Sequence, residues 1–289
     1  MKILFFDSGV GGLSVFKDVL KRLPEASYYY LFDHECFPYG NKSEVFLQKR
    51  VCELLTKLSA KVKPDLIVIA CNTASTIVLP TLREHFMMPI VGVVPAIKPA
   101  AKLSRKKIIA LLATQGTVKR AYTDFLINEF APCCKVIKIG SQDLVRLCEG
   151  YLIQESQQQS TNEALELQTL ESLKSILSPI SSLPDESKPD VVVLGCTHFP
   201  LLKQEIATIL GPEIKLVDSG EAVARRVQSL LEGATFSKDC EQHEQDALGP
   251  QEAFYTGKCS EEEHKKLQAV FTHLGFKQLC HFSALLKTL

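Results

Sequence analysis

Short apolar runs alternate with longer amphipathic segments along most of the chain. Continuous apolar runs of about 4–8 residues are typical of parallel strands that are buried on both faces of a sheet. We expect strands over residues 2–6, 27–32, 66–70, 88–94, 106–113, 134–140, 191–195, 214–220 and 253–257.

The segments between these runs repeat their apolar residues with helical spacing. We expect helices over 13–23, 44–62, 141–152, 164–177, 199–210, 221–231 and 261–276, one from about 117, and one that begins after Cys71. The alternation of strand and helix predicts an α/β protein with mainly parallel sheets flanked by helices.

One motif occurs twice, as KPDLIVIACNT at 63–73 and as KPDVVVLGCTH at 188–198. A length of 289 residues also suits two small domains better than one. We therefore expect two pseudo-symmetric α/β domains with the active site between them. The expected domains are 1–96 plus 219–289, and 97–218, with the proline-containing segment 93–102 as the hinge.

Charge and hydropathy exclude several classes of partner. Lys plus Arg and Asp plus Glu both number 33, so there is no long-range attraction to nucleic acid or to an anionic membrane. The basic run 98–107 is interpreted as a solvated linker or turn. No apolar run approaches the roughly 18 residues of a membrane span, and the first one ends at Asp7, too short for a signal peptide. We expect a cytoplasmic protein.

The chain has ten cysteines but no CxxC pair. In a reducing compartment these thiols stay free. The densest Cys/His set fits no standard zinc spacing, so no metal site is expected. It comprises Cys240, His243, Cys259, His264, Cys280 and His281.

Polar side chains follow four of the predicted strands, where ligands of α/β sheets bind. They are Asp7 and Ser8, then Cys71, Asn72 and Thr73, then Thr114 and Thr117, and finally Cys196, Thr197 and His198. One site between two sheets would collect all four groups. Taken singly, each hydroxyl is better explained as a helix cap or a turn residue.

Cys71 and Cys196 stand out because each ends a buried strand close to a predicted helix N-terminus, which lowers a thiol pKa. Two opposed thiols suit removal of a proton from one face of a carbon and delivery to the other, as racemisation requires. A redox disulfide is the competing use. Five other cysteines are interpreted as small buried apolar residues: Cys36, Cys52, Cys133, Cys134 and Cys148.

The turn DSGVGGLS at 7–14 has two interpretations. Its glycines would let the backbone approach a ligand, and the following helix N-terminus favours an anion. A dinucleotide-binding fingerprint is the rival, with Ser14 where Gly or Ala is expected and Asp33 at a plausible ribose distance. Asp7 and Ser8 are also explained by a helix N-cap.

Five motifs, DSGVGGLS, PYGNKS, ACNTAS, GCTHFPLL and VDSG, occur in the order seen in the glutamate racemase family, which the chain resembles over nearly its whole length. The resemblance implies a cofactor-independent isomerase that interconverts L- and D-glutamate. It also implies that the enzyme is a homodimer. The D-glutamate would supply the synthesis of bacterial peptidoglycan, and hence the cell wall and cell shape. A racemase of another amino acid such as aspartate, or less readily a nucleotide-binding module, is the alternative.

The resemblance also implies roles for individual residues. Cys71 would take the α-proton from D-glutamate and Cys196 from L-glutamate, assisted by Asp7, His198 and Glu149. Residues implied to hold the substrate are Ser8, Tyr39, Gly40, Asn72, Thr73, Thr114, Thr117 and Thr197.

The chain departs from the family pattern in three places. Segments 154–187 and 235–250 are longer than in compact members, and Lys258 and Cys259 stand where the family often has a Gly/Asp-type turn. We expect 235–250 to be a mobile loop, and 154–164 to be either a loop or the start of a helix. Members that need a cell-wall precursor as activator often carry an N-terminal extension; this chain begins at its first strand, so no such requirement is expected.

Overall fold

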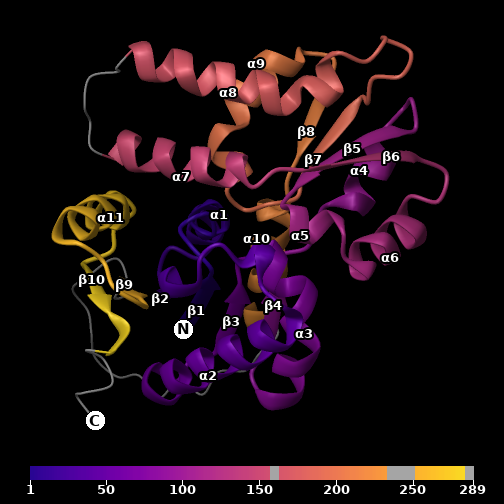
Figure 1. The fold of residues 1–289 in the computed structure, drawn as a ribbon. Coiled ribbons are helices and arrows are strands. Elements are labelled where there is room, and N and C mark those ends of the chain that lie inside the picture. The colour runs from indigo at the N-terminus through magenta and orange to yellow at the C-terminus, as the bar shows by residue number, and fades with distance from the viewer. Residues whose placement is uncertain (157–162, 233–250, 284–289) are drawn as a thin grey trace.

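The computed structural model describes residues 1–156, 163–232 and 251–283, and shows two parallel sheets with helices packed against them (Figure 1). The strands are β1 (Lys2–Asp7), β2 (Ser27–Phe32), β3 (Leu66–Ile69), β4 (Ile90–Gly92), β5 (Ile108–Ala113), β6 (Lys135–Gly140), β7 (Val191–Leu194), β8 (Lys215–Val217), β9 (Gln251–Tyr255) and β10 (Gln278–His281). Every described strand pair is parallel, so the predicted fold class is confirmed.

The helices begin and end close to the predicted positions. They are α1 (Leu13–Arg22), α2 (Glu44–Val62), α3 (Asn72–His85), α4 (Ile97–Leu103), α5 (Gln115–Val118), α6 (Ala121–Phe130), α7 (Asp143–Ser156), α8 (Glu163–Ser181), α9 (Lys203–Leu210), α10 (Gly220–Glu232) and α11 (Glu261–His273), with 3-10 turns η1 (His34–Cys36), η2 (Tyr39–Asn41) and η3 (Phe199–Leu202). Local chemistry sets these limits: Ser43 caps α2 by accepting a hydrogen bond from the backbone N–H of Phe46.

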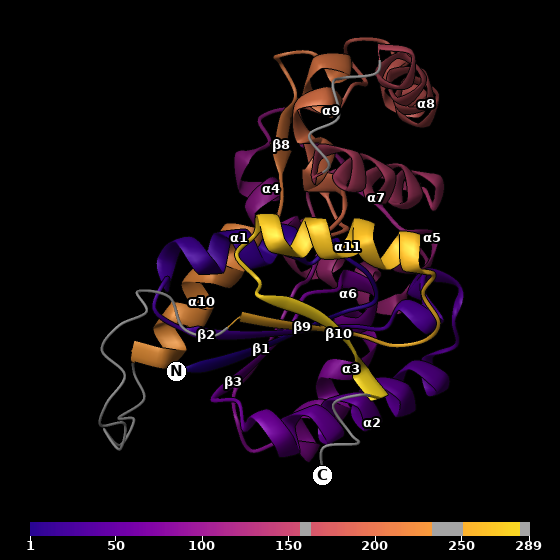
Figure 2. The same ribbon diagram turned by 90° about the vertical axis from the view of Figure 1, so that its left-hand side faces the viewer.

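The two sheets define two lobes. The first lobe is built on the strand order β10-β9-β2-β1-β3-β4, and the second on β6-β5-β7-β8. In the first lobe α1, α10 and α11 cover one face of the sheet, and α2 and α3 cover the other (Figure 2). Strands β1, β3, β5 and β7 lie inside their sheets, so their carboxyl ends place polar side chains near the middle of the molecule. The domain limits proposed from sequence stay a prediction.

Several details differ from the sequence-based expectations. The expected hinge and basic linker contain helix α4, which tolerates Pro99 because the N–H groups of a first helical turn have no partner within the helix. The predicted helix over 199–210 divides into η3 and α9, and the one from about 117 divides into α5 and α6. Strand β10 was not predicted.

The predicted loop 235–250 and the centre of the polar segment 154–164 lie outside the described residues. No helix in the described part of the chain is long and apolar enough to cross a membrane.

Candidate active site

A small cavity lies between the two lobes and contains both candidate thiols. Its volume is about 20 Å³, roughly the space of one water molecule. Its lining comprises Asp7, Ser8, Phe37, Pro38, Tyr39, Gly40, Cys71, Asn72, Thr73, Thr114, Gln142, Val145, Cys196, Thr197 and His198. The first lobe supplies Cys71 after β3 and the second supplies Cys196 after β7, so the facing arrangement that the repeated motif suggested is present.

A larger cleft, about 410 Å³, opens on the side of α1 and α10 and reaches Asn72, Cys196 and Thr197 from behind. Its lining includes neither Cys71 nor Asp7. We centre the site on the smaller cavity, because only there do both thiols and the polar ends of both sheets meet.

Asp7 is fully buried at the end of β1 and stabilises the turn that precedes α1. Its carboxylate accepts hydrogen bonds from the backbone N–H of Ser8 at 2.6 Å and of Gly12 at 2.7 Å. Gly12, rather than Asp7, is the N-cap residue of α1. Burial raises the pKa of Asp7, although the charge of His198 and these N–H groups act in the opposite direction.

Cys71 is the N-cap residue of α3 and lies beside Ser8. Its Sγ accepts from the backbone N–H of Ala74 at 3.5 Å and lies 3.5 Å from Ser8 Oγ. Burial, and then the negative charge of Asp7, raise the pKa of Cys71 above its usual value of 9.0. The N–H of Ala74 at the helix N-terminus lowers this pKa, as predicted, but burial and the charge of Asp7 outweigh it, so the expected net lowering is not found.

Cys196 has a different neighbour, the imidazole of His198. Its Sγ lies 3.7 Å from His198 Nδ1, and His198 Nε2 lies 3.1 Å from Glu149 Oε1, which comes from α7. Burial alone would lower the pKa of His198, but its contacts with Cys196 and Glu149 outweigh that effect and raise the pKa well above 6.5. These contacts therefore favour the charged form of the imidazole.

The glycines of DSGVGGLS make room for this histidine and glutamate. A Cβ atom on Gly9 would lie 2.5 Å from Glu149 Oε1, and one on Gly11 would fall on the ring of His198. The close approach is thus to side chains of the second lobe. The glycines therefore give no support to the dinucleotide interpretation. Its other support was the Asp33 carboxylate, which already accepts hydrogen bonds from Arg50 at 3.0 and 2.7 Å and from Tyr39 at 2.8 Å.

Three threonine hydroxyls join the lobes beside the cavity. Thr73 Oγ1, from α3, lies 3.2 Å from Thr114 Oγ1 and 3.3 Å from Thr117 Oγ1, and the last two are 2.9 Å apart. Thr114 is also the N-cap residue of α5. The cap explanation for this threonine therefore holds alongside its place in the cavity wall.

The predicted site residues divide into a lining set and a supporting set. Glu149 and Thr117 do not line the cavity, but stand behind His198 and Thr114. Tyr39 lines it while its hydroxyl donates to Asp33. The remaining predicted residues line the cavity directly: Asp7, Ser8, Gly40, Cys71, Asn72, Thr73, Thr114, Cys196, Thr197 and His198.

Sequence reasoning missed four lining residues, which are Phe37, Pro38, Gln142 and Val145. Gln142 is the informative one, since its buried Nε2 has no hydrogen-bond partner among the described residues, and the same is true of Asn72 Oδ1. Buried polar atoms without a partner are rare, and these two residues line the cavity, where a ligand could pair with them. Gln142 follows the predicted strand 134–140, and polar residues after that strand were not among the candidates.

All cysteines in the described ranges are free, including Cys71 and Cys196. Cys148 is buried as predicted, but the prediction of burial is wrong for Cys133, which is exposed, and Cys36, Cys52 and Cys134 are only partly buried. No group of three metal-ligating side chains gathers at the cavity within the described part of the chain.

The chain is similar to known amino-acid racemases. The Asp/Glu/Hydantoin racemase family model matches residues 14–227. Glutamate racemase of Salmonella typhimurium is 50% identical over 230 residues, 80% of this chain and 77% of that protein. Glutamate racemase of Shewanella frigidimarina is 52% identical over 229 residues, 79% of this chain and 83% of that protein.

Solved structures show the same likeness across the whole fold. Escherichia coli glutamate racemase, solved in complex with L-glutamate and the activator UDP-MurNAc-ala, gives a TM-score of 0.84 at 43% identity and covers 97% of both chains. A glutamate racemase isoform of Bacillus anthracis gives 0.75 at 26% identity, covering 96% of this chain and 95% of that one. The chain therefore belongs to the glutamate racemase branch of the Asp/Glu/hydantoin racemase family.

Proposed function

We propose that this isomerase interconverts L- and D-glutamate with Cys71 and Cys196 acting on opposite faces of the substrate Cα. The observation that carries the proposal is that one cavity between the lobes contains both thiols, one from the end of β3 and one from the end of β7. A carbon held between them can lose its proton to one sulfur and gain a proton from the other.

The proposed reaction balances without an added reagent. With L-glutamate, the Cys196 thiolate takes the α-proton and becomes a thiol, the electron pair stays on Cα and its carboxylate, and the Cys71 thiol donates its proton to the opposite face. With D-glutamate the sulfurs exchange roles. Each turnover leaves the two thiols in exchanged protonation states, and proton exchange with solvent restores them.

Each sulfur has its own assisting group in this scheme. The His198 imidazole lies 3.7 Å from Cys196 Sγ and can exchange a proton with it. Ser8 Oγ lies 3.5 Å from Cys71 Sγ and 3.4 Å from Asp7 Oδ1, so the hydroxyl can pass a proton between thiol and carboxylate. Glu149 does not line the cavity and acts by positioning His198.

Hydroxyl and amide groups would hold the substrate. The proton on Cα is a very weak acid, so donors aimed at the α-carboxylate are needed to stabilise the developing carbanion. Ser8, Thr73 and Thr114 supply hydroxyls. The two unpartnered atoms complete the set: Gln142 Nε2 would donate to a substrate carboxylate, and Asn72 Oδ1 would accept from the ammonium group.

The size of the cavity adds one requirement. A volume of about 20 Å³ is far smaller than glutamate, so the lobes or the lining side chains must move apart for substrate to enter. Closing again would exclude water from the two thiols, which strengthens every charge interaction around Cα.

The proposal is tested by incubating the protein with L-glutamate in D2O without cofactor or other additive. Formation of D-glutamate that carries deuterium at Cα is the expected result. If only aspartate gained deuterium at Cα, the substrate would be aspartate rather than glutamate. If no amino acid gained deuterium at Cα, the proposal that this site racemises an amino acid would be overturned. Turnover without additive also tests the expectation that no activator is needed.

The biological setting and assembly belong to the same proposal. D-glutamate made by the chain would supply peptidoglycan synthesis, and the cytoplasmic location stays a prediction. The chain would form a homodimer, for which exposed apolar side chains on α2 and α6, such as Phe46 and Phe125, offer a surface. Sedimentation analysis gives the oligomeric state directly.

A further inference from the structure

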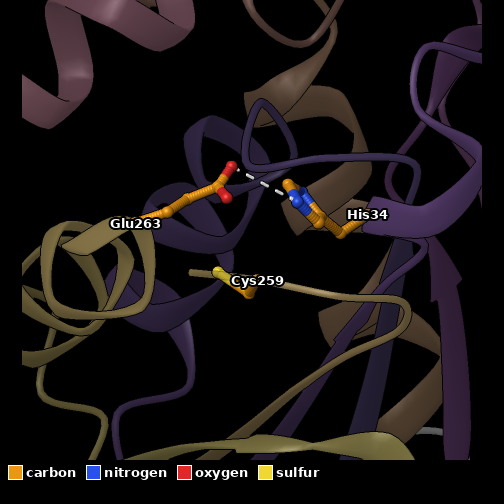
Figure 3. Close-up of side chains that lie close together, drawn as sticks. All are labelled: His34, Cys259 and Glu263. Atoms are coloured by element: carbon orange, nitrogen blue, oxygen red, sulfur yellow. Dashed lines mark ion pairs between the residues drawn. The ribbon is translucent and has the colours of Figure 1, made fainter. Parts of the chain in front are cut away.

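A second group of reactive side chains lies outside the cavity, where η1 meets the start of α11. His34 belongs to η1, Cys259 precedes α11, and Glu263 lies in its first turn. One nitrogen, one sulfur and one carboxylate oxygen from these residues all lie within 4.8 Å of one another. Figure 3 shows the Glu263 carboxylate directed at the His34 ring, with the Cys259 sulfur close to both.

We propose that His34, Cys259 and Glu263 bind one divalent transition-metal ion, for which Zn²⁺ is the best match. This ion would link α11 to the loop that leads into the cavity.

The spacing of two of the ligand atoms already fits zinc. Zinc–nitrogen and zinc–oxygen bonds of about 2.0–2.1 Å at a tetrahedral angle place those two atoms roughly 3.3–3.4 Å apart. His34 Nε2 and Glu263 Oε1 are 3.3 Å apart. With a zinc–sulfur bond of about 2.3 Å, the sulfur would lie roughly 3.6 Å from each of these two atoms. Cys259 Sγ lies within 4.8 Å of both, so a side-chain movement of about 1 Å would bring it to that distance.

The donor types select the same class of ion. Imidazole nitrogen, thiolate sulfur and carboxylate oxygen together suit zinc, whereas calcium and magnesium take oxygen ligands. An entering ion would displace the proton of the Cys259 thiol, and the fourth position would stay open to water because the protein supplies three ligands.

The two chain segments that carry the ligands are already joined. Thr256 Oγ1, in the loop between β9 and α11, accepts from the backbone N–H of Glu35 at 3.2 Å and donates to Asp33. Asp33 and Glu35 adjoin His34 in the chain, and Thr256 precedes Cys259 by three residues. Little chain ordering is therefore needed when the ion binds, which lowers the cost of binding.

In a neighbouring cluster of similar side chains, the cation position is already taken by an arginine. Asp33, Glu35 and Cys36 also place ligand atoms within 4.8 Å of one another. There, however, the guanidinium of Arg50 pairs with Asp33 at 2.7 Å and with Glu35 at 2.6 Å, so a cation already occupies the position. Glu263 pairs with no lysine or arginine in the described ranges; its ion-pair partner there is His34, which is itself a ligand.

The position of the ion would connect two elements of the cavity. His34 begins the segment that continues into Phe37, Pro38 and Tyr39 of the cavity wall. Helix α11 packs against α7, the helix that carries Glu149. Bound zinc would hold these two elements together and raise the thermal stability of the chain.

Titration of the full-length, reduced and metal-free chain with Zn²⁺ and with Co²⁺ tests the proposal. We expect one equivalent of Zn²⁺, a higher melting temperature, and a sulfur-to-Co²⁺ charge-transfer absorption. Cys259→Ser should abolish that absorption and the thermal shift. His34→Gln and Glu263→Gln should each weaken Zn²⁺ affinity by at least about tenfold, and serve if the first variant folds poorly.

Two control variants separate this site from other thiols. Cys133→Ser removes an exposed cysteine outside the cluster, and Cys196→Ala removes a cavity thiol. Both should bind metal as the unchanged chain does. The proposal is overturned if the chain binds no Zn²⁺, if the Co²⁺ absorption survives in Cys259→Ser, or if it disappears in Cys196→Ala.

Discussion

The surroundings of Cys71 and Cys196 differ although the strands that carry them are alike. Each cysteine follows a buried parallel strand, and both line one cavity. Cys71 lies next to Ser8 and the carboxylate of Asp7, whereas Cys196 lies next to the imidazole of His198. The repeated motif thus fixes where the two sulfurs lie, while residues far away in the sequence decide the charge that each one meets.

This difference has a chemical consequence. Burial and the negative charge of Asp7 keep the proton on Cys71, because both raise its pKa. On the other side, contacts with Cys196 and Glu149 raise the pKa of His198 against the effect of burial. The two sulfurs therefore have different neighbours, a carboxylate reached through Ser8 beside Cys71 and an imidazole beside Cys196.

Removing either sulfur gives the largest expected effect. Cys71→Ala and Cys196→Ala should each reduce racemisation by at least roughly 10⁴-fold, since each direction of the reaction needs both groups. Circular dichroism and melting temperature should show that the fold persists. Near-normal turnover by either variant would refute the assignment of two bases, and Cys133→Ser serves as the thiol control because Cys133 is exposed.

Changing the assisting groups should slow proton transfer at the two faces of Cα separately. His198→Asn and Asp7→Asn should each lower kcat/KM by roughly 10²-fold. The loss of kcat/KM must be equal for L- and D-glutamate, because the equilibrium constant of a racemisation is unity. The two faces are therefore distinguished by the isotope effect. With Cα-deuterated substrates, His198→Asn should enlarge the isotope effect for L-glutamate and Asp7→Asn that for D-glutamate.

A shift of the same sign for both enantiomers in both variants would show that the two assisting groups are not specific to one face. His85→Asn is the matched control for the histidine change, because His85 is exposed and contacts Thr56 on the surface.

The glycine turn tests whether the position of His198 matters as well as its charge. Gly11→Ala should lower kcat by roughly 10²-fold, since the new Cβ displaces the imidazole ring. Gly9→Ala should cost less because it meets the movable end of Glu149. Gly150→Ala is the control: its Cβ meets nothing within 4 Å, and the helix gains up to about 1 kcal/mol of stability. Equal activity of the Gly11 and Gly150 variants would contradict this account.

The pH dependence of stability gives the smallest effect. The pKa values of Asp7 and His198 are both raised in the folded chain, so both groups bind protons more tightly when folded. The stability that each contributes is complete below its ordinary pKa, 3.8 for Asp7 and 6.5 for His198, and is lost as pH rises through the raised value.

Urea unfolding across pH, compared between the unchanged chain, Asp7→Asn and His198→Asn, measures these two contributions. The difference caused by Asp7 should diminish from acidic pH upward, and that caused by His198 only above pH 6.5. A His198 contribution that grows with pH would mean that the imidazole is neutral in the folded chain.

Much of the fold follows from the sequence, because periodicity and burial are local properties. Apolar runs located the strands from β1 to β9, but the short segment QLCH of β10 mixes polar and apolar residues and gave no signal. Proline suggested a hinge at residues 93–102, yet Pro99 lies in the first turn of α4, where proline does no harm.

The site was predictable only in part, because its details depend on contacts between the lobes. The strand-end rule and the family resemblance located both thiols. Nothing in the chain indicated that Gly11 makes room for His198, or that Gln142 is left without a partner. The same holds for His34 and Cys259, which are far apart in sequence and meet only through packing of β9 and α11 on β2.

The central claim is that two different thiols act on opposite faces of one carbon, and early-time isotope analysis tests it most directly. The unchanged chain is given L-glutamate in D2O, and both enantiomers are separated at a few per cent conversion. Two bases predict deuterium at Cα of nearly all the D-glutamate formed, because Cys71 delivers a solvent-derived deuteron, and little deuterium in the L-glutamate that remains. Protium retained at Cα of the D-glutamate, or equal labelling of both enantiomers from the outset, would instead show that a single group carries the proton.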